Sequence, residues 1–145
     1  MKEEEYLNNR LEDQINWYSQ KSLYNQKWYK MLRLIEIVSA ALIPFLSGMH
    51  SNLMYSNWLI GGLGVLIAVA AAAGALFKFH EQWIQYRTTS EQLKHEKYIY
   101  LTMTHPYDND NRYHLLVERV ENLISKENIF WSQASRKQAQ STRKE

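Results

Sequence analysis

The side chains of this sequence that are best suited to acid–base or metal chemistry are its five histidines, at positions 50, 80, 95, 105 and 114. Imidazole can ligate a metal ion, and it exchanges a proton near neutral pH. These spacings match neither H-E-x-x-H nor a paired Cys/His motif, the patterns that direct several ligands at one ion. His80–Glu81 and His95–Glu96 are sequence neighbours, which on a helix point about 100° apart. We therefore expect solvated or bundle-packing side chains here and no metal site.

Motifs for phosphate binding or nucleophilic catalysis are absent from the sequence. It contains no G-x-x-x-x-G-K-[ST], no G-x-G-x-x-G and no serine nucleophile elbow. Gly61, Gly62, Gly64 and Gly74 lie instead within an apolar run. There is no cysteine, which excludes disulfides, thiolate metal sites and a cysteine nucleophile. We expect no catalytic residue, no cofactor and no enzymatic activity.

Charge and hydropathy divide the chain into polar ends and an apolar middle. The 17 Lys and Arg against 15 Asp and Glu leave a net charge of +2, which is too small and mixed to indicate a nucleic-acid partner. The mean hydropathy of −0.49 conceals the apolar middle, because the charged ends dominate the average.

Two apolar segments are long enough to be membrane helices. Residues 58–77, WLIGGLGVLIAVAAAAGALF, carry no charge, and at about 1.5 Å per residue they span the roughly 30 Å hydrocarbon layer. Residues 31–49 are interrupted near their start by Arg33 and Glu36, which stand three apart and can pair near the headgroups. We predict transmembrane helices at 31–49 and 58–78, packed as an antiparallel hairpin in the lipid bilayer.

Basic residues flank this hairpin on one side. Lys and Arg precede the first segment and follow the second, whereas the connection 50–57 has neither. The positive-inside rule then predicts a multi-pass protein of the cell (inner) membrane with both termini cytoplasmic. Arg33, Glu36 and Lys78 are expected at the cytoplasmic mouth. The expected interface anchors are Trp28, Tyr29, Tyr55 and Trp58.

Small residues recur every four positions along the second segment. One stripe consists of Gly64, Ala68 and Ala72, and another of Ala70 and Gly74. Small side chains let helices approach closely in lipid, so we expect packing here, within the hairpin or between subunits. Pro44 cannot donate to the carbonyl of Ala40, which predicts either a gating bend or a kink without function.

Polar, periodic segments surround the hairpin and predict cytoplasmic helices. The expected elements are a helix at 3–30, a continuation of the second membrane helix to about residue 104, a turn at 105–111 and a helix at 111–131. Apolar faces recur at Leu7, Leu11, Ile15 and Tyr18, and at Tyr113, Leu116, Val120 and Leu123. Residues 132–145 are almost without apolar residues, which predicts a disordered tail. The fold class is all-α, with a single domain over residues 1–135.

Four short sequence segments occur together around the two predicted membrane helices. They are R-L-E-D-Q-I-N-W-Y (10–18), W-Y-K (28–30), Y-R-T-T-S-E-Q-L-K-H-E-K-Y (86–98) and L-L-V-E-R-V-E-N-L-I-S-K-E-N (115–128). With them, residues 6–131 resemble the bacterial SLATT superfamily, in the branch labelled domain of unknown function 4231. The resemblance implies a membrane effector of a bacterial conflict or defence system, linked to a nucleotide signal, that forms pores. It carries over no catalytic or ligand residue.

Three functional hypotheses follow. The first is a homo-oligomeric pore or channel regulated by its cytoplasmic helices, because two spans per subunit cannot enclose a water path. The second is a non-conducting scaffold or adaptor that recruits a cytoplasmic partner, and the third is an enzyme. Ion flux through liposomes distinguishes the first from the second.

Overall fold

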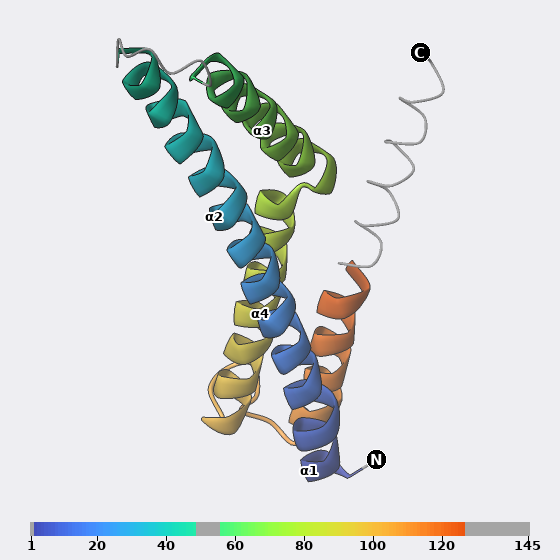
Figure 1. Ribbon diagram of the computed structural model, residues 1–145. Coiled ribbons are helices and arrows are strands. Elements are labelled where there is room, and N and C mark those ends of the chain that lie inside the picture. The colour runs from blue at the N-terminus through green and yellow to red at the C-terminus, as the bar shows by residue number, and fades with distance from the viewer. Residues whose placement is uncertain (1, 49–55, 127–145) are drawn as a thin grey trace. The chain divides into compact units, whose positions relative to one another are not determined.

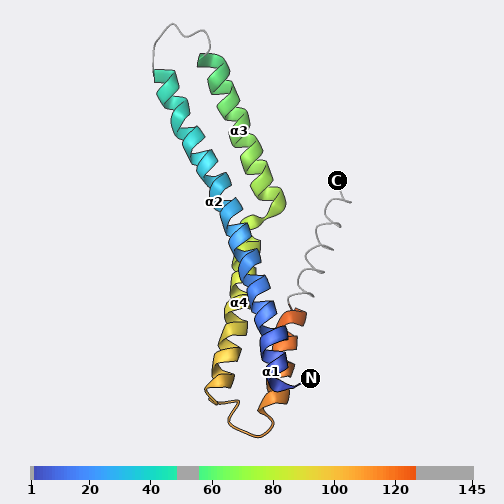
Figure 2. The same ribbon diagram turned by 60° about the horizontal axis from the view of Figure 1, so that its bottom comes forward.

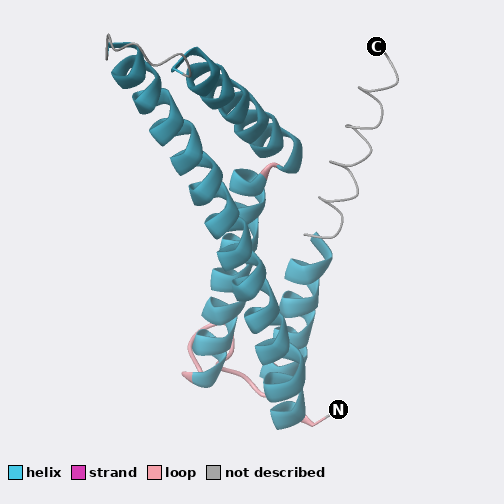
Figure 3. Ribbon diagram, viewed as in Figure 1, coloured by secondary structure: helices cyan, strands magenta, loops and turns pink. Residues whose placement is uncertain are grey.

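The computed structural model of this protein describes residues 2–48 and 56–126, and the regular structure within these ranges is helical (Figure 3). The elements are α1 (Glu3–Glu5), the π-helix η1 (Tyr6–Leu11), α2 (Glu12–Gly48), α3 (Ser56–Phe77) and α4 (Phe79–Leu101). A further helix covers residues 112–126. Figure 1 shows the course of the chain through these elements. For the described residues the predicted all-α class is confirmed.

The chain forms two compact units, and α2 and α4 contribute to both. Of the described residues, 2–20 and 86–126 belong to unit 1, and 21–48 and 56–85 belong to unit 2. The sequence predicts one domain, but the two units bury different kinds of surface. Unit 1 has an apolar core, whereas Ala70 is the one buried hydrophobic residue among the described residues of unit 2.

Unit 1 packs three helical segments around its core: the start of the chain, α4 from residue 86 onward, and helix 112–126. Its centre includes Leu11, Leu93, Leu116 and Val120, all 0% exposed. Burying each of these side chains contributes about 1.5–3 kcal/mol. Residues of the predicted apolar faces of the first and last segments belong to this one core or pack against it, so the two faces do meet. The core residues are Tyr6, Leu11, Ile15, Tyr18, Leu93, Tyr100, Tyr107, Leu116, Val120 and Ile124.

The π-helix η1 explains how both of its end residues reach this core. Tyr6 and Leu11 are five positions apart and are 5% and 0% exposed. Five residues in an α-helix turn well past a full circle, whereas the wider π-helix, with its i→i+5 hydrogen bonds, returns nearly to the same face. The widened turn thus lets Tyr6 and Leu11 pack together on the core side.

Ion pairs join the helices of unit 1 around the core. Arg10 donates to the Glu121 carboxylate at 3.2 and 3.1 Å, and the Tyr6 hydroxyl donates to it at 3.2 Å. Partly exposed pairs are worth about 1 kcal/mol or less, so the apolar core remains the main source of stability. The other pairs between helices are Arg112–Glu3, Lys97–Glu12 and Arg119–Glu96.

In unit 2, the second part of α2 and α3 lie side by side and run in opposite directions (Figures 1 and 2). Their less exposed residues recur at spacings of three and four, at positions 32, 35, 36, 39, 43 and 46 of α2 and at 60, 63, 67, 70, 73 and 74 of α3. Ser39 and Ala70 are the most buried of these, at 3% and 4% exposed. This spacing is the one by which two helices pack along a narrow seam.

The predicted continuous helix from residue 58 to about 104 is interrupted at Lys78. The φ angle of Lys78 is 49°, outside the helical region, so α3 ends at Phe77 and α4 begins at Phe79. The Lys78 N–H donates to the Gly74 carbonyl, and the Gln82 N–H donates to the Lys78 carbonyl, each at 3.1 Å. No glycine or proline stands at this point, so the sequence pattern could not reveal the break.

The end of α4 lies at Leu101, three residues before the predicted end. Met103 has a φ of 52° and donates its N–H to the Tyr100 carbonyl, while the Thr104 N–H donates to the Ile99 carbonyl, each at 3.1 Å. This pair of bonds is the Schellman ending of a helix, in which the left-handed residue is usually glycine.

The turn predicted at residues 105–111 is confirmed, since these residues form turns and bends. The following helix begins at residue 112. Its predicted end near residue 131 and the predicted tail at 132–145 lie outside the described residues, as does most of the connection 50–57.

Candidate functional site

The two apolar helices of unit 2 leave most of their large side chains exposed. Leu34 and Phe45 of α2 are 61% and 64% exposed, and Val65 and Leu76 of α3 are 65% and 72% exposed. By length and composition, two helical stretches of the described chain could each cross a membrane. An apolar surface of this extent is unusual on a soluble monomer and indicates contact with lipid or another protein.

A groove of about 490 Å³ lies within unit 2, between α2, the end of α3 and the start of α4. All three charges predicted for the cytoplasmic mouth, Arg33, Glu36 and Lys78, line it. The structure therefore brings together residues that are separated by more than forty positions in the sequence. The remaining lining residues are Tyr29, Leu32, Ala71, Gly74, Ala75, Phe79, His80 and Glu81.

Two ion pairs stand at this groove. Arg33 donates to Glu36 at 2.7 Å, which confirms the pairing expected from their spacing. Lys78 Nζ lies 3.9 Å from the carboxylate of Glu81, a residue that the sequence did not single out as part of a site. The side chain of Glu36 is only 18% exposed, whereas that of Glu81 is 73% exposed. The groove therefore carries two cations and two carboxylates.

Aromatic rings pack where α2 faces the start of α4 in unit 2. Trp28 stacks on Phe79 with ring centroids 6.2 Å apart, and Tyr29 packs on His80 at 4.6 Å and on Trp83 at 6.2 Å. Trp28 and Tyr29 are predicted interface anchors, and here they also join two helices. Trp58, another predicted anchor, is 84% exposed at the start of α3. Tyr55 lies outside the described residues.

The small residues of α3 fall on different faces. Ala70 is buried, and Gly74 lines the groove, whereas Gly64, Ala68 and Ala72 are exposed. A Cβ atom added at Gly64 or Gly74 would meet no atom within 4 Å. No described part of the chain thus packs closely on Gly64, and the role of its stripe between subunits stays a prediction.

Pro44 lies inside α2, which continues past it to Gly48. Its side chain is exposed. Proline removes one hydrogen bond from the helix ladder, but here it does not end the helix. Its role as a gating bend stays a prediction.

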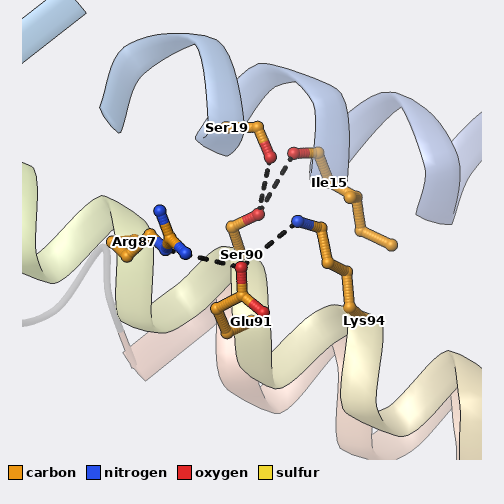
Figure 4. A network of polar contacts seen from close by, with 6 residues as sticks. All are labelled: Ile15, Ser19, Arg87, Ser90, Glu91 and Lys94. Atoms are coloured by element: carbon orange, nitrogen blue, oxygen red, sulfur yellow. Dashed lines mark hydrogen bonds and ion pairs between the residues drawn. The ribbon is translucent and has the colours of Figure 1, made fainter. Parts of the chain in front are cut away.

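In unit 1, a buried polar contact joins α2 to α4 (Figure 4). Ser90 is 1% exposed and donates to the Ile15 carbonyl at 3.4 Å, so Ser19, whose hydroxyl lies 2.8 Å away, donates to Ser90. On the neighbouring turn, Arg87 and Lys94 both pair with Glu91, at 3.4 and 3.3 Å. Small hydroxyl groups here let the two backbones come close without leaving a buried polar atom unpaired.

A second buried polar group, Glu96, joins α4 to the following turn and helix. It is 6% exposed and accepts from Arg119 at 3.1 and 2.8 Å and from the Tyr107 hydroxyl. Burial, followed by this hydrogen bond, raises the pKa of Tyr107 well above its ordinary value. The sequence predicted Glu96 as solvated or bundle-packing, and it could not show these partners.

A groove of about 660 Å³ runs along α4 beside Glu96 within unit 1. Its two arginines, Arg87 and Arg119, pair with Glu91 and Glu96, so they already have acidic partners. Among the described residues, no group of three or more His, Cys, Asp or Glu side chains is placed to hold a metal ion.

Comparison with known proteins gives one informative match. A family model described as protein of unknown function (DUF4231) matches residues 13–114, more than half of the chain. The match includes both apolar helices and the groove of unit 2. No curated protein matches, and no solved structure matches.

Proposed function

The chain belongs to the DUF4231 family, and we propose that it is a multi-pass protein of the bacterial cell membrane that assembles into a pore or channel. The observation that carries the proposal is the exposed apolar surface of α2 and α3. Because these helices bury only a narrow seam between them, their other faces require lipid or further protein.

In this proposal, residues 31–49 and 58–78 form a transmembrane hairpin with both termini in the cytoplasm. The lysines and arginines that precede α2's apolar part and follow α3 support this orientation, because positive charge is retained on the cytoplasmic side. The groove with Arg33, Glu36 and Lys78 then lies at the cytoplasmic end of the hairpin.

A water path requires several copies of the chain, since two helices cannot surround one. The exposed stripe of Gly64, Ala68 and Ala72 supports a contact between copies, because small residues allow close helix approach in lipid. Ala70 cannot serve there, since it is already buried within unit 2.

The resemblance to the SLATT superfamily supports an effector role in a bacterial conflict or defence system. Unit 1 would receive the activating signal, from a cytoplasmic partner or a nucleotide-signalling system, without catalysis of its own, a cofactor or nucleic-acid binding. The interhelical ion pairs of unit 1 support such a role, because they could be exchanged for contacts with a partner at little cost.

A non-conducting scaffold is the alternative, and the separate core of unit 1 favours it. A compact bundle anchored by two membrane helices could recruit a partner without forming any pore. The two functions differ in ion permeability and in whether assembly is needed.

Reconstitution tests both levels of the proposal. Retention of the chain in membranes after alkaline extraction is the expected result, and release without detergent would refute the membrane location. Purified protein in liposomes loaded with an ion-sensitive dye should give flux that rises steeply with protein density. Stable membrane insertion with a monomeric state in detergent and no flux would favour the scaffold.

A further inference from the structure

The groove of unit 2 lies where the apolar runs of α2 and α3 meet charged residues. On α3 the groove is lined by Ala71, Gly74 and Ala75, at the end of the apolar run that stops at Phe77. On α2 it is lined up to Glu36, where the uncharged run begins. If the apolar runs occupy the hydrocarbon layer, as the proposed function requires, the groove lies at the depth of the lipid headgroups.

The charges of the groove are balanced. Arg33 and Lys78 supply two cations, and Glu36 and Glu81 supply two carboxylates. A purely anionic ligand would meet both carboxylates, and a purely cationic ligand would meet both cations. A ligand that carries one charge of each sign therefore matches the groove best. The ion pairs leave capacity for it, because a lysine ammonium has three donors and a carboxylate has about four acceptor positions. Each group can thus bond its ion-pair partner and a ligand at the same time.

The break at Lys78 places two helix ends at the same groove. The Gly74 carbonyl and the Gln82 N–H are bonded to the backbone of Lys78. The carbonyl groups of residues 75–77 end α3 and favour a cation, while the N–H groups of residues 79–81 begin α4 and favour an anion. Ala75 and Phe79, on the two sides of the break, both line the groove. The backbone thus repeats the pairing of opposite charges that the side chains provide.

From these observations, we propose that the groove binds the phosphoethanolamine headgroup of a phospholipid. Its phosphate accepts from Lys78 and Arg33, and its primary ammonium donates to Glu36 and Glu81. The small residues of α3 leave room for the upper part of an acyl chain, since a Cβ atom at Gly74 would meet nothing within 4 Å. The occupant is a membrane lipid because Ala71 and Ala75, which line the groove, belong to the exposed apolar surface of α3, next to the exposed Leu76.

Native mass spectrometry of the full chain in detergent tests this proposal. Phosphatidylethanolamine, phosphatidylglycerol and phosphatidylcholine are titrated separately, together with soluble phosphoethanolamine. Phosphatidylethanolamine should bind roughly tenfold more tightly than the other two lipids, the effect of about one charge-assisted hydrogen bond. Equal binding of the three lipids, or binding of soluble phosphoethanolamine as tight as that of the lipid, would overturn the proposal.

Variants assign the selectivity to the groove. Glu81→Gln should remove the preference for phosphatidylethanolamine, whereas Glu91→Gln, on an exposed ion pair in unit 1, should preserve it. Gly74→Leu fills the groove and should weaken phosphatidylethanolamine binding. If Glu81→Gln and Gly74→Leu both bind this lipid like the unaltered chain, the groove is not its site.

This inference rests on the proposed membrane location but not on conduction. A chain that alkaline extraction releases from membranes would refute the proposed function itself. A chain that is retained but shows no lipid preference would refute the headgroup site alone.

Discussion

Replacing Glu96 tests whether a buried carboxylate holds the helices of unit 1 together. The side chain is 6% exposed and accepts from Arg119 and from the hydroxyl of Tyr107, which is itself 0% exposed. Glu96→Gln keeps one carbonyl oxygen as an acceptor but removes the charge. The variant should therefore weaken the attachment of helix 112–126 to α4 without changing the apolar core.

The loss of stability expected for Glu96→Gln follows from the hydrogen-bond partners of Glu96. A hydrogen bond to a charged group contributes about 1.5–3 kcal/mol, and breaking a fully buried ion pair costs about 3–5 kcal/mol. The Arg119 side chain is 44% exposed and can return to water, which reduces the loss. We expect Glu96→Gln to cost about 2 kcal/mol. Glu96→Ala should cost roughly 1–2 kcal/mol more, because it also leaves the Tyr107 hydroxyl buried without an acceptor.

Amide hydrogen exchange of the full chain in detergent micelles measures this loss of stability in helix 112–126 itself. A loss of about 2 kcal/mol corresponds to exchange roughly thirty times faster at the slowest amides of helix 112–126. Glu91→Gln is the matched control, because Glu91 lies on α4 like Glu96 but its carboxylate is half exposed. This substitution should change the exchange rates of helix 112–126 little. If Glu96→Gln and Glu91→Gln give the same exchange rates, the reasoning about the buried carboxylate is wrong.

Three further predictions concern other parts of the chain. Burial, together with the nearby Glu3 carboxylate, raises the pKa of Tyr100 from 10.0 to about 12. The stability that the protonated hydroxyl provides is therefore complete below pH 10 and is lost as the pH rises through about 12. Circular dichroism and tyrosinate absorbance should change together, and ionisation at pH 10 with intact helices would contradict this. Gly64→Leu should lower the cross-linked oligomer fraction in membranes while Val65→Leu does not, and equal fractions would count against the exposed stripe. Met103→Gly should stabilise unit 1 by about 1 kcal/mol in thermal unfolding, because it removes the cost of a left-handed non-glycine residue, and no gain would contradict the Schellman ending.

Much of the helical framework could be predicted from the sequence, because its causes are local. A run of twenty uncharged residues predicts a long apolar helix, since a helix satisfies its backbone within the segment. The turn at 105–111 follows from its Pro, Asp and Asn residues. The apolar faces of unit 1 follow from spacings of three and four.

Features that depend on distant partners could not be predicted in this way. The sequence offered two small-residue stripes on α3, and only the packing against α2 decided that Ala70 is buried and Gly64 exposed. Lys78 carries no local signal for a positive φ, yet it separates α3 from α4 and brings Glu81 to the groove.

The histidines and the charged residues illustrate the same division. Their spacing alone excluded the common metal and catalytic motifs, because such motifs require ligands at set intervals along the chain. Which charges meet was decided by the tertiary structure: Arg33 and Glu36 meet Lys78 and Glu81 at one groove, and Glu96 meets Arg119. The physical reason is that a helix determines the neighbours of a residue within four positions, whereas helix packing determines all the others.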